Sequence, residues 1–125
     1  MSVAYDAGVL VAADRNERWA WAEHCVRLLA GIVPLVPSNV LAQVSLSPRQ
    51  AQLHRFLRGC EIVDFDEPSA HRVGALLGKA GTSDVVDASL VDLAIARGAE
   101  IVTTDAADIR RLIHASGKRV PVARR

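Results

Sequence analysis

Residues 99–108 read Ala-Glu-Ile-Val-Thr-Thr-Asp-Ala-Ala-Asp, a short β-branched run that ends on an acid and passes into helix-forming residues. Its continuous apolar centre predicts a strand that is covered on both faces, as in a parallel sheet. The same organisation opens the chain, where residues 3–5 (Val-Ala-Tyr) precede Asp6. Open parallel sheets bind ligands beyond the carboxyl ends of their strands, so Asp6 and Asp105 stand where a site is expected.

The rest of the chain alternates between short strand candidates and helical stretches. We expect strands at residues 3–5, 34–36, 61–64, 100–103 and 119–122, and helices at 7–14, 17–30, 39–44, 48–57, 68–80, 84–97 and 106–115. The glycines that follow helical stretches are expected to end them in the left-handed conformation; these are Gly31, Gly59, Gly81, Gly98 and Gly117. The alternation predicts one α/β domain over residues 1–125, built on a five-stranded, mainly parallel sheet.

The composition fits a soluble globular protein rather than a disordered or membrane protein. Of 125 residues, 50% are hydrophobic and 23% are charged, which supports one real core. The formal net charge is only +1, so no global field attracts nucleic acid or a membrane surface. The start of the chain lacks a signal-peptide pattern and no window has transmembrane length, so we expect a cytoplasmic protein without membrane association.

Further acids are expected to join Asp6 and Asp105 at the strand ends. Asp84 and Asp87 lie three residues apart at the start of an apolar helix, and Asp108 follows Asp105 by one turn. Any one of them is explained as a helix cap or a first-turn acid. If the first and fourth strands are neighbours, however, all five line one crevice and repel one another without a cation. Oxygen ligands without His or Cys favour Mg²⁺ or Mn²⁺, and such a centre can hydrolyse phosphodiesters.

Two details of this crevice are expected from its chemistry. One carboxyl group should have a raised pKa, because like charges disfavour ionisation of their neighbours. One of Thr103 and Thr104 should point into the crevice, where its hydroxyl can hold a carboxylate or a metal-bound water.

Four motifs occur in order along the chain: residues 5–7 (Tyr-Asp-Ala), 40–44 (Val-Leu-Ala-Gln-Val), 84–88 (Asp-Val-Val-Asp-Ala) and 102–108 (Val-Thr-Thr-Asp-Ala-Ala-Asp). Together they resemble the PIN-domain ribonucleases, in particular the VapC-type toxins of bacterial toxin–antitoxin pairs. The resemblance implies a three-layer sandwich around the sheet and an endoribonuclease that depends on Mg²⁺ or Mn²⁺. It also implies an RNA substrate, a homodimer and neutralisation by a small cognate antitoxin.

By position, the resemblance places catalytic roles on Asp6, Gln43, Asp87 and Asp105. The expected metal ligands are Asp6, Asp84, Asp87, Asp105 and Asp108. The family usually has Glu where this chain has Gln43, which is nearly isosteric and keeps a carbonyl oxygen as a ligand. The loss of one negative charge should weaken divalent-ion binding, and Asp84 is expected to restore that charge.

Other functions remain open at this point. Gln43 favours a catalytically weakened PIN domain that binds RNA or a protein. A receiver-like phosphorylation domain would use Asp64 and a Lys after the fifth strand, but Lys118 precedes that strand. A haloacid-dehalogenase-type phosphatase needs a second Asp two residues after the first, where Gly8 stands.

The homodimer is expected to form through the two helices within residues 39–57. Together these helices and their connection carry more apolar side chains than a short hairpin needs to cover a sheet edge. The residues concerned are Val40, Leu41, Val44, Leu46, Leu53, Phe56 and Leu57.

Overall fold

The computed structural model describes all residues 1–125 and contains one five-stranded sheet, which is parallel throughout. The strands are β1 (Ser2–Tyr5), β2 (Leu35–Pro37), β3 (Glu61–Val63), β4 (Ala99–Thr103) and β5 (Val122–Arg124), in the order β3-β2-β1-β4-β5. The prediction of a five-stranded parallel sheet with the first and fourth strands adjacent is therefore confirmed. No helix has both the length and the apolar character needed to cross a membrane.

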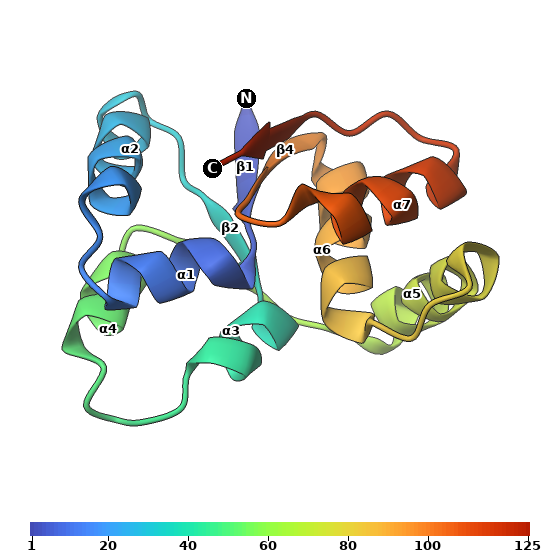
Figure 1. Cartoon of the computed structure of the whole chain (residues 1–125), viewed down its shortest axis with the longest axis horizontal. Helices are drawn as coiled ribbons and strands as arrows, with labels where there is room; N and C mark the ends of the chain where they lie inside the picture. Colours follow the sequence, from blue (N-terminus) through green and yellow to red (C-terminus); the bar gives the residue numbers. More distant parts are fainter.

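Helices cover both faces of the sheet, so the fold has three layers (Figure 1). The helices are α1 (Ala7–Asp14), α2 (Arg18–Leu29), α3 (Ser38–Val44), α4 (Ala51–Leu57), α5 (Glu67–Ala80), α6 (Val85–Arg97) and α7 (Ala106–Ser116). Alternate residues of β1 pack against the two helical layers, because successive side chains of a strand point to opposite faces of the sheet. Val3 and Tyr5 pack with α1–α4, whereas Ala4 packs with α5–α7.

The strand order makes a topological switch point between β1 and β4, and we call the region beyond the carboxyl ends of these two strands the crevice. The connections after β1 and β2 run over one face of the sheet, and those after β3 and β4 run over the other (Figure 1). Because β1 and β4 are neighbours, in the register Tyr5↔Val102, their following segments diverge at the carboxyl ends of the strands. This is the position at which open α/β sheets bind ligands.

The last strand differs from its prediction, since it occupies residues 122–124 rather than 119–122. Pro121 has no N–H to donate to the ladder, and its carbonyl oxygen accepts from the Ile101 amide at 2.9 Å, where the pairing with β4 begins. Helix α4 likewise begins at Ala51 rather than Pro48. The Gln50 side chain accepts from the amides of Leu46 and Ser47 at 2.7 and 2.8 Å, which closes a turn before the helix.

The glycine predictions hold at four of five positions. Gly31, Gly81, Gly98 and Gly117 have positive φ, whereas Gly59 does not, so its assignment as a left-handed helix end was wrong. The reason for a glycine there is close packing against α2. A Cβ atom at Gly59 would lie 2.8 Å from Leu28 Cδ1 and 3.0 Å from His24 Nε2.

The surface argument for a dimer through residues 39–57 is contradicted by the burial of its side chains. Val40, Val44, Leu53 and Phe56 are buried in the core between the sheet and α1–α4. Only Leu46 is strongly exposed, at 81%. The short helices α3 and α4 cover the core of their own chain, so they leave little apolar surface for a second copy.

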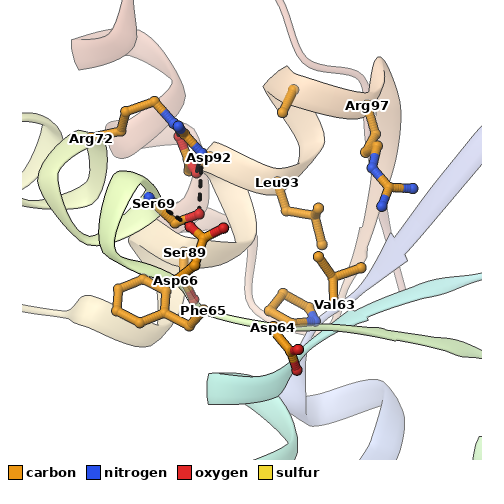
Figure 2. A pocket seen from close by; sticks show the side chains of 12 residues that line it. Val63, Asp64, Phe65, Asp66, Ser69, Arg72, Ser89, Asp92, Leu93 and Arg97 are labelled. Carbon is orange, nitrogen blue, oxygen red and sulfur yellow. Dashed lines mark hydrogen bonds and ion pairs between the residues drawn. The ribbon is translucent and has the colours of Figure 1, made fainter.

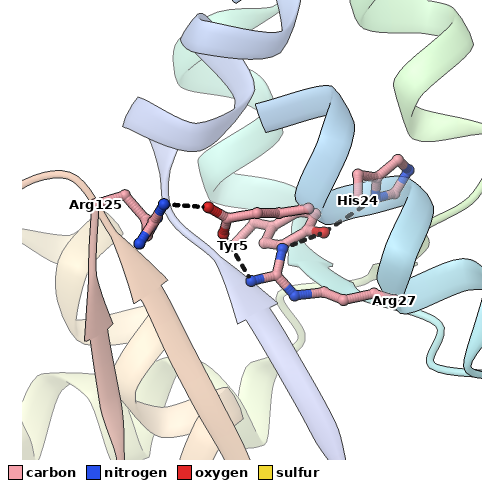
Figure 3. A network of polar contacts seen from close by, with 5 residues as sticks. Tyr5, His24, Arg27 and Arg125 are labelled. Carbon is pink, nitrogen blue, oxygen red and sulfur yellow. Dashed lines mark hydrogen bonds and ion pairs between the residues drawn. The ribbon is translucent and has the colours of Figure 1, made fainter. Parts of the chain in front are cut away.

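A buried polar network ties β1 to α2 (Figure 3). The Tyr5 hydroxyl donates to His24 Nδ1 at 2.9 Å, and His24 Nε2 donates to the Phe56 carbonyl oxygen at 3.2 Å. The His24 ring also stacks on Phe56, with ring centroids 3.9 Å apart. This arrangement requires a neutral imidazole, and burial lowers the pKa of His24 and raises the pKa of Tyr5 to about 12.

Acidification should weaken this network. The pKa of His24 is lower in the folded protein than its ordinary value of 6.5, so the unfolded chain binds the proton first and stability falls as pH drops below 6.5. The loss at pH 5 is limited to about 2 kcal/mol, because one proton changes the stability by at most about 1.4 kcal/mol for each pH unit below 6.5. The check is the difference in melting temperature between wild type and His24→Gln at pH 7.5 and pH 5. That difference should shrink on acidification, whereas a matched comparison with the exposed His71→Gln should show no change with pH.

Candidate active site

Asp6, at the carboxyl end of β1, is held in a fixed position by three donors. Its side chain is buried, with 8% of the residue exposed. Oδ1 accepts from the Val9 amide at 3.0 Å, which caps α1, and Oδ2 accepts from the Thr104 amide at 3.1 Å and from the Thr103 hydroxyl. The expectation that one of the two threonines holds a carboxylate is thus confirmed for Thr103.

Asp105, at the end of β4, is connected to Asp6 through the same hydroxyl. The Asp105 amide donates to Thr103 Oγ1 at 3.0 Å, so one side chain fixes both strand ends. Asp105 occupies the N-cap position of α7, yet its side chain makes no capping hydrogen bond and is exposed. Helix capping therefore does not account for the acid at this position, and its carboxylate is free for a ligand.

Gly8, in the first turn of α1, lets the Thr104 side chain lie against this helix. A Cβ atom at Gly8 would stand 1.8 Å from Thr104 Oγ1 and 2.9 Å from Thr104 Cβ. No L side chain fits at that distance, and any shift would move the Thr104 amide that binds Asp6. This packing role of Gly8 could not be predicted from the sequence, because the close approach comes from a residue 96 positions away.

The start of α6 contributes a third group of acids. Asp84 caps this helix by accepting from the Asp87 amide at 3.0 Å. Asp87 is half-buried, and its pKa is raised to about 7 by burial first, and then by the negative charges of Asp84, Asp108 and Asp6. Residues from β1, α6 and α7 thus share one electrostatic neighbourhood, and the expectation of a raised carboxyl pKa is met by Asp87.

The donor set has the chemistry that a hard divalent cation requires. It consists of carboxylates only, and none of the ion pairs in the protein neutralises them. The side chains do not stand at ligand distances, however, because no three His, Cys, Asp or Glu residues lie close enough together to hold a metal ion. Like charges repel one another, and a cation would have to draw the carboxylates inward.

The remaining predicted site residue, Gln43, lies near the end of α3, which packs against α6. Its side chain is exposed and makes no hydrogen bond within the chain. The structure therefore places Asp84, Asp108 and Asp6 near enough to Asp87 to raise its pKa, whereas Asp105 and Gln43 are exposed and do not contribute to that shift.

Comparison with protein families decides the fold family. A family model described as the PIN domain matches residues 6–114, which include all of these acids. The chain belongs to the PIN-domain family. This result overturns the receiver-like and phosphatase alternatives, which rested on Asp64 and on a second acid at the position of Gly8.

Solved PIN-like structures show how far the resemblance of fold extends. A chain in the crystal structure of VapBC2 from Rickettsia felis, bound to a DNA fragment from their promoter, aligns with a TM-score of 0.74 at 24% identity, over 100% of this chain and 99% of that one. A chain in a toxin–antitoxin complex from Klebsiella pneumoniae aligns with a TM-score of 0.65 at 18% identity, over 85% and 88%. A chain in the crystal structure of FitAcB from Neisseria gonorrhoeae aligns with a TM-score of 0.62 at 15% identity, over 96% of this chain and 95% of that one. A sequence comparison with curated proteins finds no match.

Proposed function

We propose that this PIN domain is an endoribonuclease that depends on Mg²⁺ or Mn²⁺ and is the toxin of a toxin–antitoxin pair in the cytoplasm. The observation that carries the proposal is the group of acids at the ends of β1 and β4 and the start of α6, where burial and then the negative charges of Asp84, Asp108 and Asp6 raise the pKa of Asp87 to about 7. Membership of the PIN-domain family supports a nuclease, and the similar folds found in toxin–antitoxin structures support the biological role.

The roles of the residues follow from how each is held. Asp6, Asp87 and Asp105 would bind the ion, with Asp84 and Asp108 adding negative charge. Asp6 is already oriented by three donors, so it is the fixed ligand of the set. Asp87 must release its proton before it can bind a cation. When bound, the ion would polarise the scissile phosphate and lower the pKa of a water nucleophile.

Gln43 favours a second candidate function, in which the PIN domain has little catalytic activity and acts by binding RNA or a protein. With Gln at position 43, α3 brings no negative charge to the crevice. Gln43→Glu should tighten Mn²⁺ binding and raise cleavage by about ten- to hundredfold, since a charged contact in a partly buried site is worth on the order of 1.5–3 kcal/mol. Asp84→Asn in the original background should abolish the remaining activity.

Calorimetry with Mn²⁺ and cleavage of a fluorescent single-stranded RNA measure both effects of these substitutions. Gln52→Glu on α4 is the control for an added charge outside the crevice. If Gln43→Glu and Asp84→Asn both leave affinity and cleavage unchanged, the compensation between these two positions does not exist. If no version of the protein cleaves RNA, the binding function replaces the enzymatic one.

The proposed antitoxin needs a surface, and α2 offers an exposed apolar one. Val26 and Leu29 are 67% and 90% exposed, and they share a helix face with Ala22 and Cys25. Val26→Glu with Leu29→Glu should therefore abolish co-purification with the product of an adjacent short reading frame, while the melting temperature stays unchanged. The matched variant Leu46→Glu, on the loop between α3 and α4, should retain the partner. Light scattering of the isolated protein tests separately whether it forms the homodimer that the family resemblance implies.

A further inference from the structure

An open groove lined only by basic and apolar residues lies between α7 and the edge strand β5. It has a volume of about 600 Å³, and Arg110, His114, Lys118 and Arg119 line it together with Ile113 and residues 120–122. No acidic residue contributes to it. Arg110, Lys118 and Arg119 are exposed, and none takes part in the ion pairs of the protein.

A second cavity that contains two arginines differs in this respect (Figure 2). It measures about 200 Å³ and lies between α5, α6 and the end of β3. Arg72 there is paired with Asp92 at 2.9 Å, and Arg97 is paired with Glu61 at 2.9 Å. Both cations are therefore satisfied within the chain, whereas the cations of the α7–β5 groove take part in no ion pair.

Strand β5 connects the groove to the neighbouring strand β4, at whose end Asp105 lies. Arg124 pairs with Thr103 in the sheet, and the Arg125 amide donates to the Thr103 carbonyl oxygen at 2.8 Å. Val122 packs with α5–α7 and Ala123 with α1–α4, so strand alternation places Arg124 on the same face as the groove. The groove itself is lined by the loop before β5 and by residues 110–114 of α7, the helix that begins directly after Asp105.

The floor of the groove is fixed by hydrogen bonds. The Lys118 amide donates to Ser116 Oγ at 3.1 Å, and the Pro121 carbonyl accepts from the Ile101 amide at 2.9 Å. The loop that carries Lys118 and Arg119 is therefore anchored at both ends, so its cations need little ordering to bind a ligand.

We propose that the α7–β5 groove binds the phosphodiester backbone of the substrate strand beyond the point of cleavage. This inference rests on the proposed function. A crevice lined by carboxylates repels a polyanion, and the net charge of +1 supplies no attraction at long range, so affinity for RNA must come from a cationic surface beside the crevice. Contacts to phosphate position a strand without reading its sequence. The groove therefore provides affinity and alignment, and it does not select a base.

The test compares wild type with the triple variant Arg110→Gln, Lys118→Gln and Arg119→Gln. A matched control replaces three exposed arginines on the opposite helical layer, Arg15, Arg18 and Arg58, by Gln. Anisotropy of a fluorescent single-stranded RNA in EDTA, at several salt concentrations, reports binding without cleavage. Because each phosphate contact to a single strand contributes about 0.7 to the slope of log K against log salt, the groove variant should lose about 2 from that slope and bind about tenfold or more weakly.

The outcomes separate the groove from the proposed function. If the groove variant and the control have equal RNA affinity and an equal salt slope, the groove does not bind the RNA backbone, even if wild type cleaves RNA with Mn²⁺. Weaker binding in the groove variant alone supports the groove, even if no version cleaves RNA. Polyglutamate serves as a second probe. If the groove variant no longer binds polyglutamate but still binds RNA as tightly as wild type does, the groove binds an acidic protein and the proposal is wrong.

Discussion

Asp87→Asn is expected to stabilise the metal-free protein at pH 8 and to reduce metal-dependent RNA cleavage by about 100-fold or more. The pKa of Asp87 is raised from 3.8 to about 7 in the folded protein, so its stabilising contribution is complete below pH 3.8 and is lost as pH rises towards 7. If the carboxyl group were fully shielded from solvent, its ionisation in the folded protein would cost about 4 kcal/mol of stability at pH 8. Asp87 is half-buried, and with solvent screening we expect about 1–2 kcal/mol, or about 4–8 °C in melting temperature.

The measurement is thermal melting of both proteins between pH 4 and pH 8 in EDTA and in Mn²⁺. The advantage of Asp87→Asn should grow with pH in EDTA, and Mn²⁺ should stabilise wild type much more than the variant. Asp92→Asn, on the same helix but paired with Arg72 outside the crevice, is the control and should show neither effect. An Asp87→Asn protein that melts no higher than wild type at pH 8 would contradict the electrostatic account of the crevice.

Gly8→Ala is expected to destabilise the protein by about 2–3 kcal/mol, although alanine normally favours a helix. The added Cβ atom would meet Thr104 Oγ1 at 1.8 Å, and overpacking of this kind costs about 1–3 kcal/mol. The shift of Thr104 should also weaken Mn²⁺ binding, because the Thr104 amide holds Asp6.

Urea unfolding with a matched glycine variant checks this prediction. Gly74→Ala, in α5, meets no atom within 4 Å and should stabilise the protein by about 0.5–1 kcal/mol. Thr104→Ala in the Gly8→Ala background should recover part of the lost stability. If both alanine variants are stabilised equally, Gly8 has no packing role.

The sheet could be predicted from the sequence because its signals are local. The apolar runs at residues 3–5 and 99–103 each precede an Asp, and their adjacency in the structure brings Asp6 and Asp105 to the same edge. The last strand was misplaced because Val120 and Val122 both suit a strand, and only the pairing with β4 decides which of them joins the ladder. Gly59 was misassigned for a similar reason, since its role depends on contact with α2.

The site was predicted in its residue types but not in its geometry. Helix spacing places Asp84 and Asp87 on one face, which sequence can show. The repulsion between the carboxylates depends on distances that the sequence does not give. The hydrogen bond from the Thr103 hydroxyl to Asp6 joins segments about 100 residues apart in the chain. The basic groove was not foreseen because Arg110, Lys118 and Arg119 become one surface only when α7 packs over β5.

Cleavage of a fluorescent single-stranded RNA by the purified protein, in EDTA and in millimolar Mn²⁺, tests the central claim most directly. Asp6→Asn, purified in the same way, controls for a contaminating nuclease and removes the charge of the best-ordered ligand. The account predicts cleavage by wild type in Mn²⁺, none in EDTA, and a loss of about 100-fold or more in Asp6→Asn. Equal cleavage by the two proteins in Mn²⁺, or cleavage by wild type that EDTA does not reduce, would contradict it.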